Sequence, residues 1–194
     1  MTPPMKNFLQ MMYALLNSRY YPLVNPWIDL RYRLPRKNIV KSRVLNVGVG
    51  DGNSGVARQL PFIPFKSLTM IDVHEPYLKN AKARFWDAKE VSFVKADVRD
   101  YPVSDFDIVM MFDVLEHLTK ADSLSVLSRI RGTAVVFIPL EKEYRKNVYE
   151  VESQDHLSMW TEQDFIDLGF KTEVLHNFHK EDDRVFDALW AIRK

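Results

Sequence analysis

Glycines concentrate at one place in the chain, and their spacing indicates a site that binds a cofactor. Four of the six glycines fall within eight residues: Gly48, Gly50, Gly52 and Gly55. They follow the β-prone run 44–47 and precede a predicted helix. Glycine permits a tight turn there and lets a ligand approach bare backbone, while the helix start offers free N–H groups to an anionic group. We therefore expect this loop to bind a cofactor that carries adenosine.

Two acidic residues stand where the next two strands should end. Asp72 lies twenty residues beyond Gly52, and a carboxylate at that distance can accept both hydroxyl hydrogens of a ribose. Asp97 follows the third β-prone run. Ligands of open α/β sheets bind at the carboxyl ends of the strands, so the loop and both acids should meet at one ligand. A single strand-end aspartate is often only a helix cap, but the three features together favour cofactor binding.

The glycine loop fits two patterns. Residues 50–55 fit the dinucleotide pattern G-x-G-x-x-G, whereas Gly48, Gly50 and Gly52 fit G-x-G-x-G. In the second pattern the sequence resembles the class I S-adenosylmethionine-dependent methyltransferases, whose first motif is a hydrophobic strand, an acidic or similar polar residue and G-x-G-x-G. Three further segments resemble the second, third and fourth motifs of that family: 70–73, 95–98 and 106–118.

This resemblance implies that the cofactor is S-adenosylmethionine, with its ribose held by Asp72 and its adenine flanked by Asp97 and the residue after it. Asn46 departs from the family, which usually has Asp or Glu there to position the methionyl amino group, so a weaker affinity is expected. Val49 replaces a residue that is often small. The residues implied at the cofactor are Asn46, Gly48, Val49, Gly50, Gly52, Asp72, Val73, Asp97, Val98, Phe112 and Asp113.

The acceptor side of the predicted site contains histidines and an acid. Methyl transfer from a sulfonium is an in-line displacement, so a general base is needed chiefly when the acceptor is a hydroxyl. We predict Glu116, His117 and His156 as catalytic residues. Residues 155–161 (DHLSMWT) resemble the H-x-S-x-W-T segment of some small-molecule methyltransferases. The alternative is that His117 caps a helix while His156 and Trp160 pack the loop down.

A second resemblance concerns Asp113, Glu116, His117 and His156, which are similar to the metal site of small-RNA 3′-end methyltransferases. Oxygen and nitrogen ligands suit a divalent cation, and the basic N-terminal region would suit RNA. However, the Glu-His pair is common in family members without a metal, and Asp113 stands where the RNA enzymes have Glu. We therefore predict no metal and a small-molecule acceptor with an O or N nucleophile. The alternatives are a methyltransferase acting on RNA or other nucleic acid, and a non-catalytic binding module.

The residue pattern predicts an α/β fold: a seven-stranded Rossmann-like sheet, mostly parallel, with an antiparallel C-terminal hairpin and helices on both faces. The expected strands are 44–47, 67–71, 91–94, 106–112, 133–138 (stopped by Pro139), 170–175 and 185–192. One expected helix follows Asn53 or Ser54, and the next starts at Pro76 with Leu78, Ala81 and Phe85 facing inward. A further helix carries Leu124, Leu127 and Ile130, and the last runs from Thr161, in a capping box with Asp164, to Gly169.

The composition indicates one compact domain, with residues 1–40 as an N-terminal helical lid or cover and 41–194 as the cofactor-binding domain. Cysteine is absent, which excludes thiolate chemistry. No apolar run reaches the roughly 20 residues of a membrane helix, so we expect a cytoplasmic protein without a membrane partner. Residues 1–66 carry ten Lys/Arg against two Asp/Glu, but these are interleaved with apolar residues, which favours a solvated face. The oligomeric state is left open.

Overall fold

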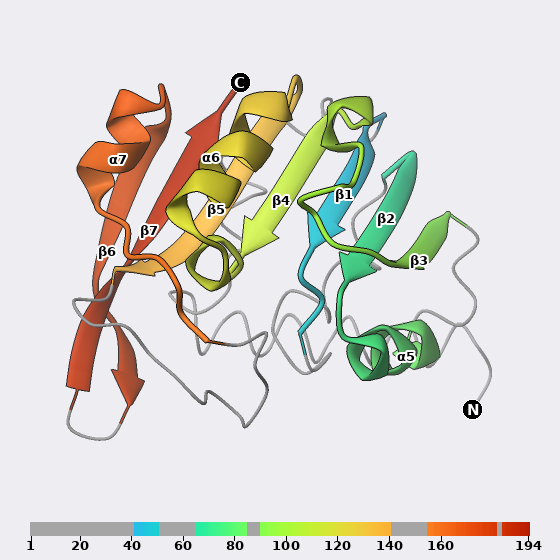
Figure 1. The fold of residues 1–194 in the computed structure, drawn as a ribbon, viewed down its shortest axis with the longest axis horizontal. Coiled ribbons are helices and arrows are strands. Elements are labelled where there is room, and N and C mark those ends of the chain that lie inside the picture. Colours follow the sequence, from blue (N-terminus) through green and yellow to red (C-terminus); the bar gives the residue numbers. More distant parts are fainter. Residues whose placement is uncertain (1–40, 51–64, 85–89, 141–154, 182–183) are drawn as a thin grey trace.

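The computed structural model describes residues 41–50, 65–84, 90–140, 155–181 and 184–194. Seven strands form one sheet in the order β3-β2-β1-β4-β5-β7-β6 (Figure 1). Their bounds are β1 (Arg43–Val47), β2 (Ser67–Asp72), β3 (Val91–Lys95), β4 (Ile108–Phe112), β5 (Thr133–Leu140), β6 (Lys171–Glu181) and β7 (Arg184–Arg193). The pairs among β1 to β5 are parallel, and β7 runs antiparallel to both β5 and β6. The predicted fold class and the terminal hairpin are thus confirmed.

The strand order reverses at one place, between β1 and β4. The chain steps outward from β1 to β2 and β3, and then returns to pair β4 with the other side of β1. Loops leaving β1 and β4 therefore diverge, and such a switch point is where open α/β sheets hold their ligands. β1, β2 and β4 point toward the same edge, at the bottom of Figure 1. The predicted site residues follow these strands, so the topology brings them to one edge.

Both faces of the sheet carry an apolar core, because the central strand β4 is apolar along its whole length. β4 (IVMMF) is buried at every position. On one face Trp190 packs edge to face against Phe112 and Phe137, with ring centroids 5.5 and 5.4 Å apart. On the other face the ring of Phe165 lies 4.9 Å from that of Trp160. Two cores on opposite faces are the packing expected of a mostly parallel sheet.

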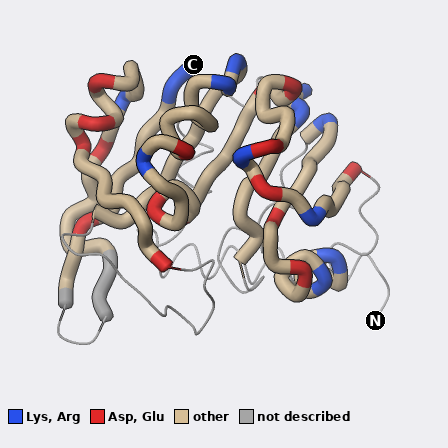
Figure 2. The backbone as a smooth tube through the Cα atoms, in the orientation of Figure 1, with Lys and Arg blue, Asp and Glu red and all other residues tan. Residues whose placement is uncertain are grey.

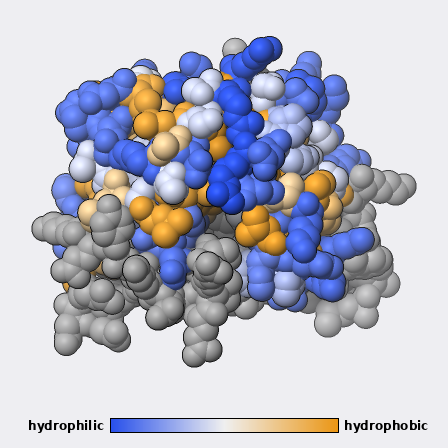
Figure 3. Space-filling view, viewed as in Figure 1, coloured by the Kyte–Doolittle hydropathy of each residue, from blue (hydrophilic) through white to orange (hydrophobic). Residues whose placement is uncertain are grey.

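Three α-helices are described: α5 (Glu75–Arg84), α6 (Lys120–Arg129) and α7 (Glu162–Asp167). Two 3-10 turns, η2 (Val103–Asp105) and η3 (Leu115–His117), flank β4. α6 and α7 lie in front of the sheet in Figure 1, and their buried side chains share one core, whereas those of α5 belong to the other. Figure 3 shows this front as largely hydrophilic with small separate hydrophobic areas. No helix in the described segments has the length and apolarity needed to cross a membrane.

The ends of α7 follow the predicted caps, and α6 has a cap that was not predicted. Thr161 caps α7 in a full capping box with Asp164, as expected, and Gly169 behind the helix has a φ of 79°. Thr119 caps α6 by accepting a hydrogen bond from the Asp122 N–H. Each cap satisfies N–H groups that the helix cannot pair internally.

The bounds of three predicted strands are wrong. β4 begins at Ile108 rather than at 106, and β6 runs to Glu181 rather than to 175. β5 does not stop at Pro139 but continues to Leu140. The pairing of β4 with β5 ends at Phe137, so at Pro139 the strand has a neighbour on one side only, and a missing N–H is tolerated there. Leu124 is 39% exposed, because the face of α6 that carries Val126 is turned toward the core and Leu124 lies outside that face.

Several predictions concern residues outside the described ranges. These are the N-terminal lid or cover at residues 1–40, the helix after Asn53 or Ser54, the inward side chain of Phe85, and the part of the proposed acceptor lid at 141–154.

Gly132 provides a test of packing at the start of β5. A Cβ there would lie 2.5 Å from the Asp107 carbonyl oxygen and 2.6 Å from that of Phe106. Because backbone cannot move aside cheaply, we expect Gly132→Ala to lower the free energy of unfolding by about 1–3 kcal/mol. Gly169→Ala is the control, because its Cβ would meet none of the described residues within 4 Å and only its positive φ would be strained. Urea denaturation measures both, and an equal or smaller loss for Gly132→Ala would contradict the prediction.

Candidate functional site

The loop after β1 is shaped by two glycines with left-handed backbone, Gly48 (φ 73°) and Gly50 (φ 64°). The Gly48 N–H donates to the Ile71 carbonyl at 3.0 Å, which continues the pairing of β1 with β2. A Cβ on Gly48 would lie 2.6 Å from Cγ2 of Val114, whereas one on Gly50 would meet none of the described residues within 4 Å. Gly48 is therefore required by packing, and at Gly50 the positive φ is what favours glycine. Gly52 lies outside the described residues.

Asp72 ties the end of β2 to this loop. Its Oδ2 accepts a hydrogen bond from the Val49 N–H at 2.8 Å, and its Oδ1 accepts one from the His74 N–H at 2.7 Å. The carboxylate is thus held in one orientation. Each oxygen of an ionised carboxylate can accept a second bond, so the group retains capacity for two hydroxyl donors.

Asn46 carries an orphaned acceptor at the centre of the switch point. The side chain is 1% exposed, and its amide nitrogen donates to the Gly48 carbonyl at 3.3 Å. Its Oδ1 is buried without a hydrogen-bond partner among the described residues. A buried acceptor without a partner costs free energy, which a donor on a bound ligand would recover. An ammonium group, such as that of a methionyl moiety, meets this need.

The chain after β3 forms a tight turn of alternating charge, which Figure 2 shows as adjacent red and blue segments between β3 and β4. Asp97 Oδ1 accepts from the Arg99 N–H at 2.9 Å, and Oδ2 accepts from Arg99 Nη2 at 2.6 Å. The hydrogen bond from Arg99 lowers the pKa of Asp97 from its ordinary 3.8. Val98 is buried, and within the described segments its backbone N–H makes no hydrogen bond. A carboxylate acceptor and an N–H donor therefore stand side by side.

The Asp97–Arg99 pair should make stability depend on acidity. A carboxyl whose pKa is lowered by folding contributes stability above its unfolded pKa and loses it as the pH falls through its folded pKa. We therefore expect the stability advantage of the wild type over Asp97→Asn to be largest near neutral pH and to shrink from about pH 5 downward. Urea denaturation at neutral and acidic pH measures it. A difference that stays constant with pH would show that the ion pair does not act on stability.

The acceptor side of the site begins where β4 ends. Asp113 adopts a positive φ of 51° and turns the chain into η3, which presents Glu116 and His117. The Glu116 carbonyl accepts hydrogen bonds from the N–H groups of Leu157 at 2.6 Å and Ser158 at 3.1 Å. These bonds fasten residues 155–161 beneath the edge of the sheet, although they lie some forty residues further along the chain.

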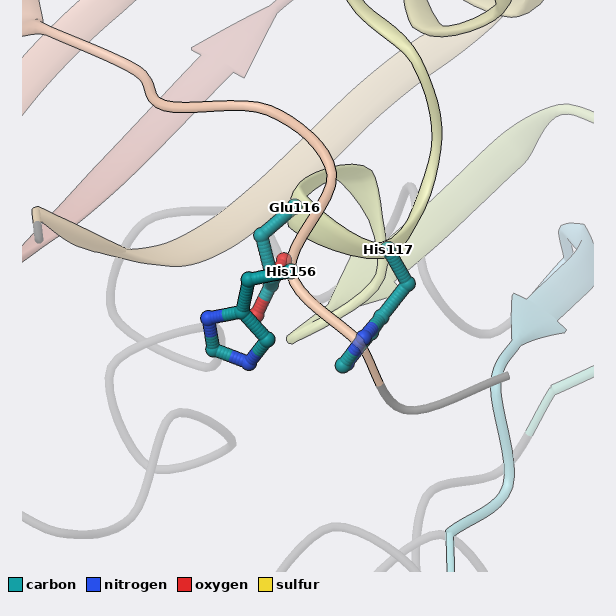
Figure 4. A group of neighbouring side chains, drawn as sticks. All are labelled: Glu116, His117 and His156. Carbon is teal, nitrogen blue, oxygen red and sulfur yellow. The ribbon is translucent and has the colours of Figure 1, made fainter. Parts of the chain in front are cut away.

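Glu116, His117 and His156, the residues predicted to be catalytic, lie together, and Figure 4 shows the three side chains around one space. One ligand atom from each lies within 4.8 Å of the others. Glu116 and His156 are 3% and 8% exposed, and the two imidazole rings meet edge to face with centroids 4.8 Å apart. His117 Nδ1 lies 3.2 Å from the Asp155 carbonyl. A carbonyl only accepts, so Nδ1 carries the proton and Nε2 is the basic nitrogen.

Trp160 does not join this cluster. It is 3% exposed, its indole N–H donates to Ser158 Oγ at 2.9 Å, and Lys120 Nζ lies 3.7 Å above its ring. Ser158 Oγ in turn donates to the Leu115 carbonyl at 2.9 Å. Trp160 thus packs the segment onto α6, which was the alternative expected for it.

Two participants were not predicted. The Asp155 carbonyl orients His117, and no side-chain pattern announces a backbone contact between residues so far apart. Arg99 binds Asp97, the acid expected to contact adenine, and its position two residues after Asp97 is the signal in the sequence for this pair.

Comparisons with known proteins agree on the class of the chain. Residues 44–135 match the family model described as a methyltransferase domain. No curated protein sequence matches the chain.

Solved structures with the same fold share little sequence with this chain. The methyltransferase domain of bacterial CtHen1 is 21% identical, with a TM-score of 0.55 over 84% of this chain and 94% of that one. N-methyltransferase NodS from Bradyrhizobium japonicum, in complex with S-adenosyl-L-homocysteine, is 18% identical, with a TM-score of 0.56 over 78% and 76%. The CurJ carbon methyltransferase is 16% identical, with a TM-score of 0.57 over 82% and 50%. Taken with the fold, the family match over residues 44–135 supports an S-adenosylmethionine-dependent methyltransferase.

Proposed function

We propose that this methyltransferase acts on the O or N nucleophile of a small molecule, and that the acceptor binds at Glu116, His117 and His156. The observation that carries the proposal is that these three side chains meet at the same sheet edge as the glycine loop and Asp72. The resemblance of residues 155–161 to a segment of small-molecule methyltransferases supports the acceptor class.

The residues at the switch point supply the contacts that S-adenosylmethionine needs. Asp72 accepts from the ribose hydroxyls, and Asp97 and the Val98 N–H bind the amino group and a ring nitrogen of the adenine. Asn46 Oδ1 accepts from the methionyl ammonium, so a neutral amide does the work of the acid usual in the family. The remaining residues that we propose to line the cofactor are Val49, Val73, Phe112 and Asp113.

When bound, the cofactor supplies an activated methyl group that passes from sulfur to the attacking nucleophile in line. The protein then has to align the acceptor and remove its proton. His117 serves as the base, because the Asp155 carbonyl holds its proton on Nδ1 and so leaves Nε2 to take the acceptor's proton. Glu116 and His156 are placed to orient the acceptor and to stabilise the imidazolium that forms.

Turnover with defined acceptors tests this proposal. The enzyme is incubated with S-adenosylmethionine and a panel of small alcohols, phenols and amines, and release of S-adenosylhomocysteine is followed. We expect turnover with at least one class. Calorimetric binding of the cofactor without any turnover, on this panel and on RNA, would favour a non-catalytic binding module. No binding heat and no thermal shift at millimolar cofactor would refute the placement of the cofactor.

A second candidate is methyl transfer to RNA assisted by a divalent cation. Two imidazoles and a carboxylate suit a first-row transition ion, and a bacterial CtHen1 methyltransferase domain shares the fold. Bonds of about 2.0–2.2 Å keep two ligand atoms within about 4.4 Å, so a cation would have to draw the 4.8 Å cluster slightly closer. Asp113 is not one of the three ligands, which weakens the comparison. Turnover of RNA that is abolished by chelator and restored by Mn²⁺ would favour this candidate, and filter binding at moderate salt would measure RNA affinity.

A further inference from the structure

Arg129, in the last turn of α6, is bound to the loop that follows β3. Its Nη1 donates to the Tyr101 carbonyl at 2.9 Å, and its Nη2 donates to the carbonyls of Val98 at 3.0 Å and Arg99 at 2.7 Å. One planar guanidinium therefore holds three carbonyls of a four-residue stretch. Arg129 and the loop that it holds lie some thirty residues apart in the chain.

The half-buried side chain of Arg129 is satisfied by the backbone of the loop. In the described part of the chain Arg129 forms no ion pair with a carboxylate, so its bonding goes to neutral carbonyls of one loop. The rigid fork of a guanidinium can serve three acceptors at once, which an ammonium on a flexible stem cannot do in the same geometry. The contact is therefore specific for the shape of the loop.

The held stretch adjoins the adenine contacts proposed above, because the Val98 N–H lies at its start and Asp97 directly precedes it. Besides the Asp97–Arg99 bonds, the loop is closed by bonds of 3.2 Å from the Asp100 N–H to the Asp97 carbonyl and 3.4 Å from the Tyr101 N–H to the Val98 carbonyl. Arg129 adds three bonds from outside the loop and so anchors it. α6 provides that anchor, because it is fixed to the core by Val126 and Leu127, both fully buried.

We infer that Arg129 is a positioning residue for cofactor binding, which holds the loop after β3 in the conformation that receives the adenine. The inference rests on the proposed placement of adenine at Asp97 and Val98. Arg129 touches neither the adenine nor the methyl group; it acts by sparing the cofactor the entropic cost of ordering the loop.

The test compares the dissociation constant of S-adenosylhomocysteine across variants of the full chain. Arg129→Met keeps an apolar stem and removes all three bonds, and we expect it to raise the dissociation constant about ten-fold. Arg129→Lys should give a smaller increase, because one ammonium can serve only part of the carbonyl set. Hydrogen–deuterium exchange of the peptide that covers residues 96–102 should speed up in both variants without ligand.

Arg193→Met is the matched control. Arg193 also donates to backbone carbonyls, to that of Leu127 in the last turn of α6 at 2.6 Å and to that of Leu168 at the end of α7 at 3.4 Å, and none of its hydrogen bonds within the described residues goes to the loop. It should lower thermal stability without changing the affinity for S-adenosylhomocysteine. Equal affinity losses in Arg129→Met and Arg193→Met would show a general structural effect and would overturn the inference.

Asp97→Ala separates this inference from the function on which it rests. If Asp97→Ala weakens binding while both Arg129 variants bind and exchange like the wild type, the positioning role is overturned and the adenine placement stands. If Asp97→Ala leaves the affinity unchanged, the adenine placement is wrong and the inference falls with it. Discrimination between S-adenosylhomocysteine and its hypoxanthine analogue should shrink in Arg129→Met, because a displaced Asp97 no longer reads the amino group.

Discussion

Replacing Asp72 by alanine is expected to weaken the binding of S-adenosylmethionine by about 100-fold, the largest loss of affinity that we predict for a single side chain. The carboxylate has two tasks. It accepts the Val49 and His74 N–H groups, which fixes the glycine loop against the end of β2, and it offers its remaining lone pairs to the ribose. Alanine removes both, so the loop loses its anchor and the cofactor loses its ribose contact.

Isothermal titration with the cofactor measures this effect. Asp167→Ala is the control, because this exposed carboxylate on α7 accepts a hydrogen bond only from Gln163 among the described residues, and the affinity should not change. Thermal melting of both variants shows whether the fold persists. An Asp72→Ala variant that melts like the wild type and binds the cofactor equally well would mean that the ribose lies elsewhere.

Replacing His117 by alanine is expected to reduce kcat by about 100-fold or more for a hydroxyl acceptor, while cofactor affinity stays the same. The imidazole is the group that takes the acceptor's proton in the proposed reaction, and it makes none of the proposed cofactor contacts. For an acceptor that attacks as a neutral amine the loss should be smaller, because the proton can leave after the methyl group has moved. The size of the loss therefore reports on the acceptor class.

His176→Ala is the control for this prediction. His176 also pairs through Nδ1, with Asp187 Oδ2 at 2.9 Å, but it lies on β6 with a largely exposed side chain. Its replacement should leave turnover unchanged. If His117→Ala retains full turnover on a hydroxyl acceptor with cofactor affinity intact, His117 is not the base.

The local parts of the fold could be predicted because their causes are local. Alternation of apolar strands with helices predicted the sheet, and the Thr161–Asp164 pair predicted the start of α7 to the residue. Prediction was less accurate where a neighbouring strand decides the outcome. Pro139 reads as a strand breaker, yet β5 passes through it because β4 has ended and no N–H is required on that side.

The site divides in the same way. The sequence by itself determined which residue types reach the carboxyl ends of the strands, since strand direction and glycine spacing are encoded locally, and it thereby predicted Asp72 beside the glycine loop. Only the tertiary structure decided that His156 meets His117, that Asp155 orients the imidazole through its backbone, and that Arg129 holds the loop after β3. These contacts join segments thirty or more residues apart, and those of His117 with Asp155 and of Arg129 with the loop end on carbonyl groups. Every residue has a carbonyl, so residue types alone carry no signal for such contacts.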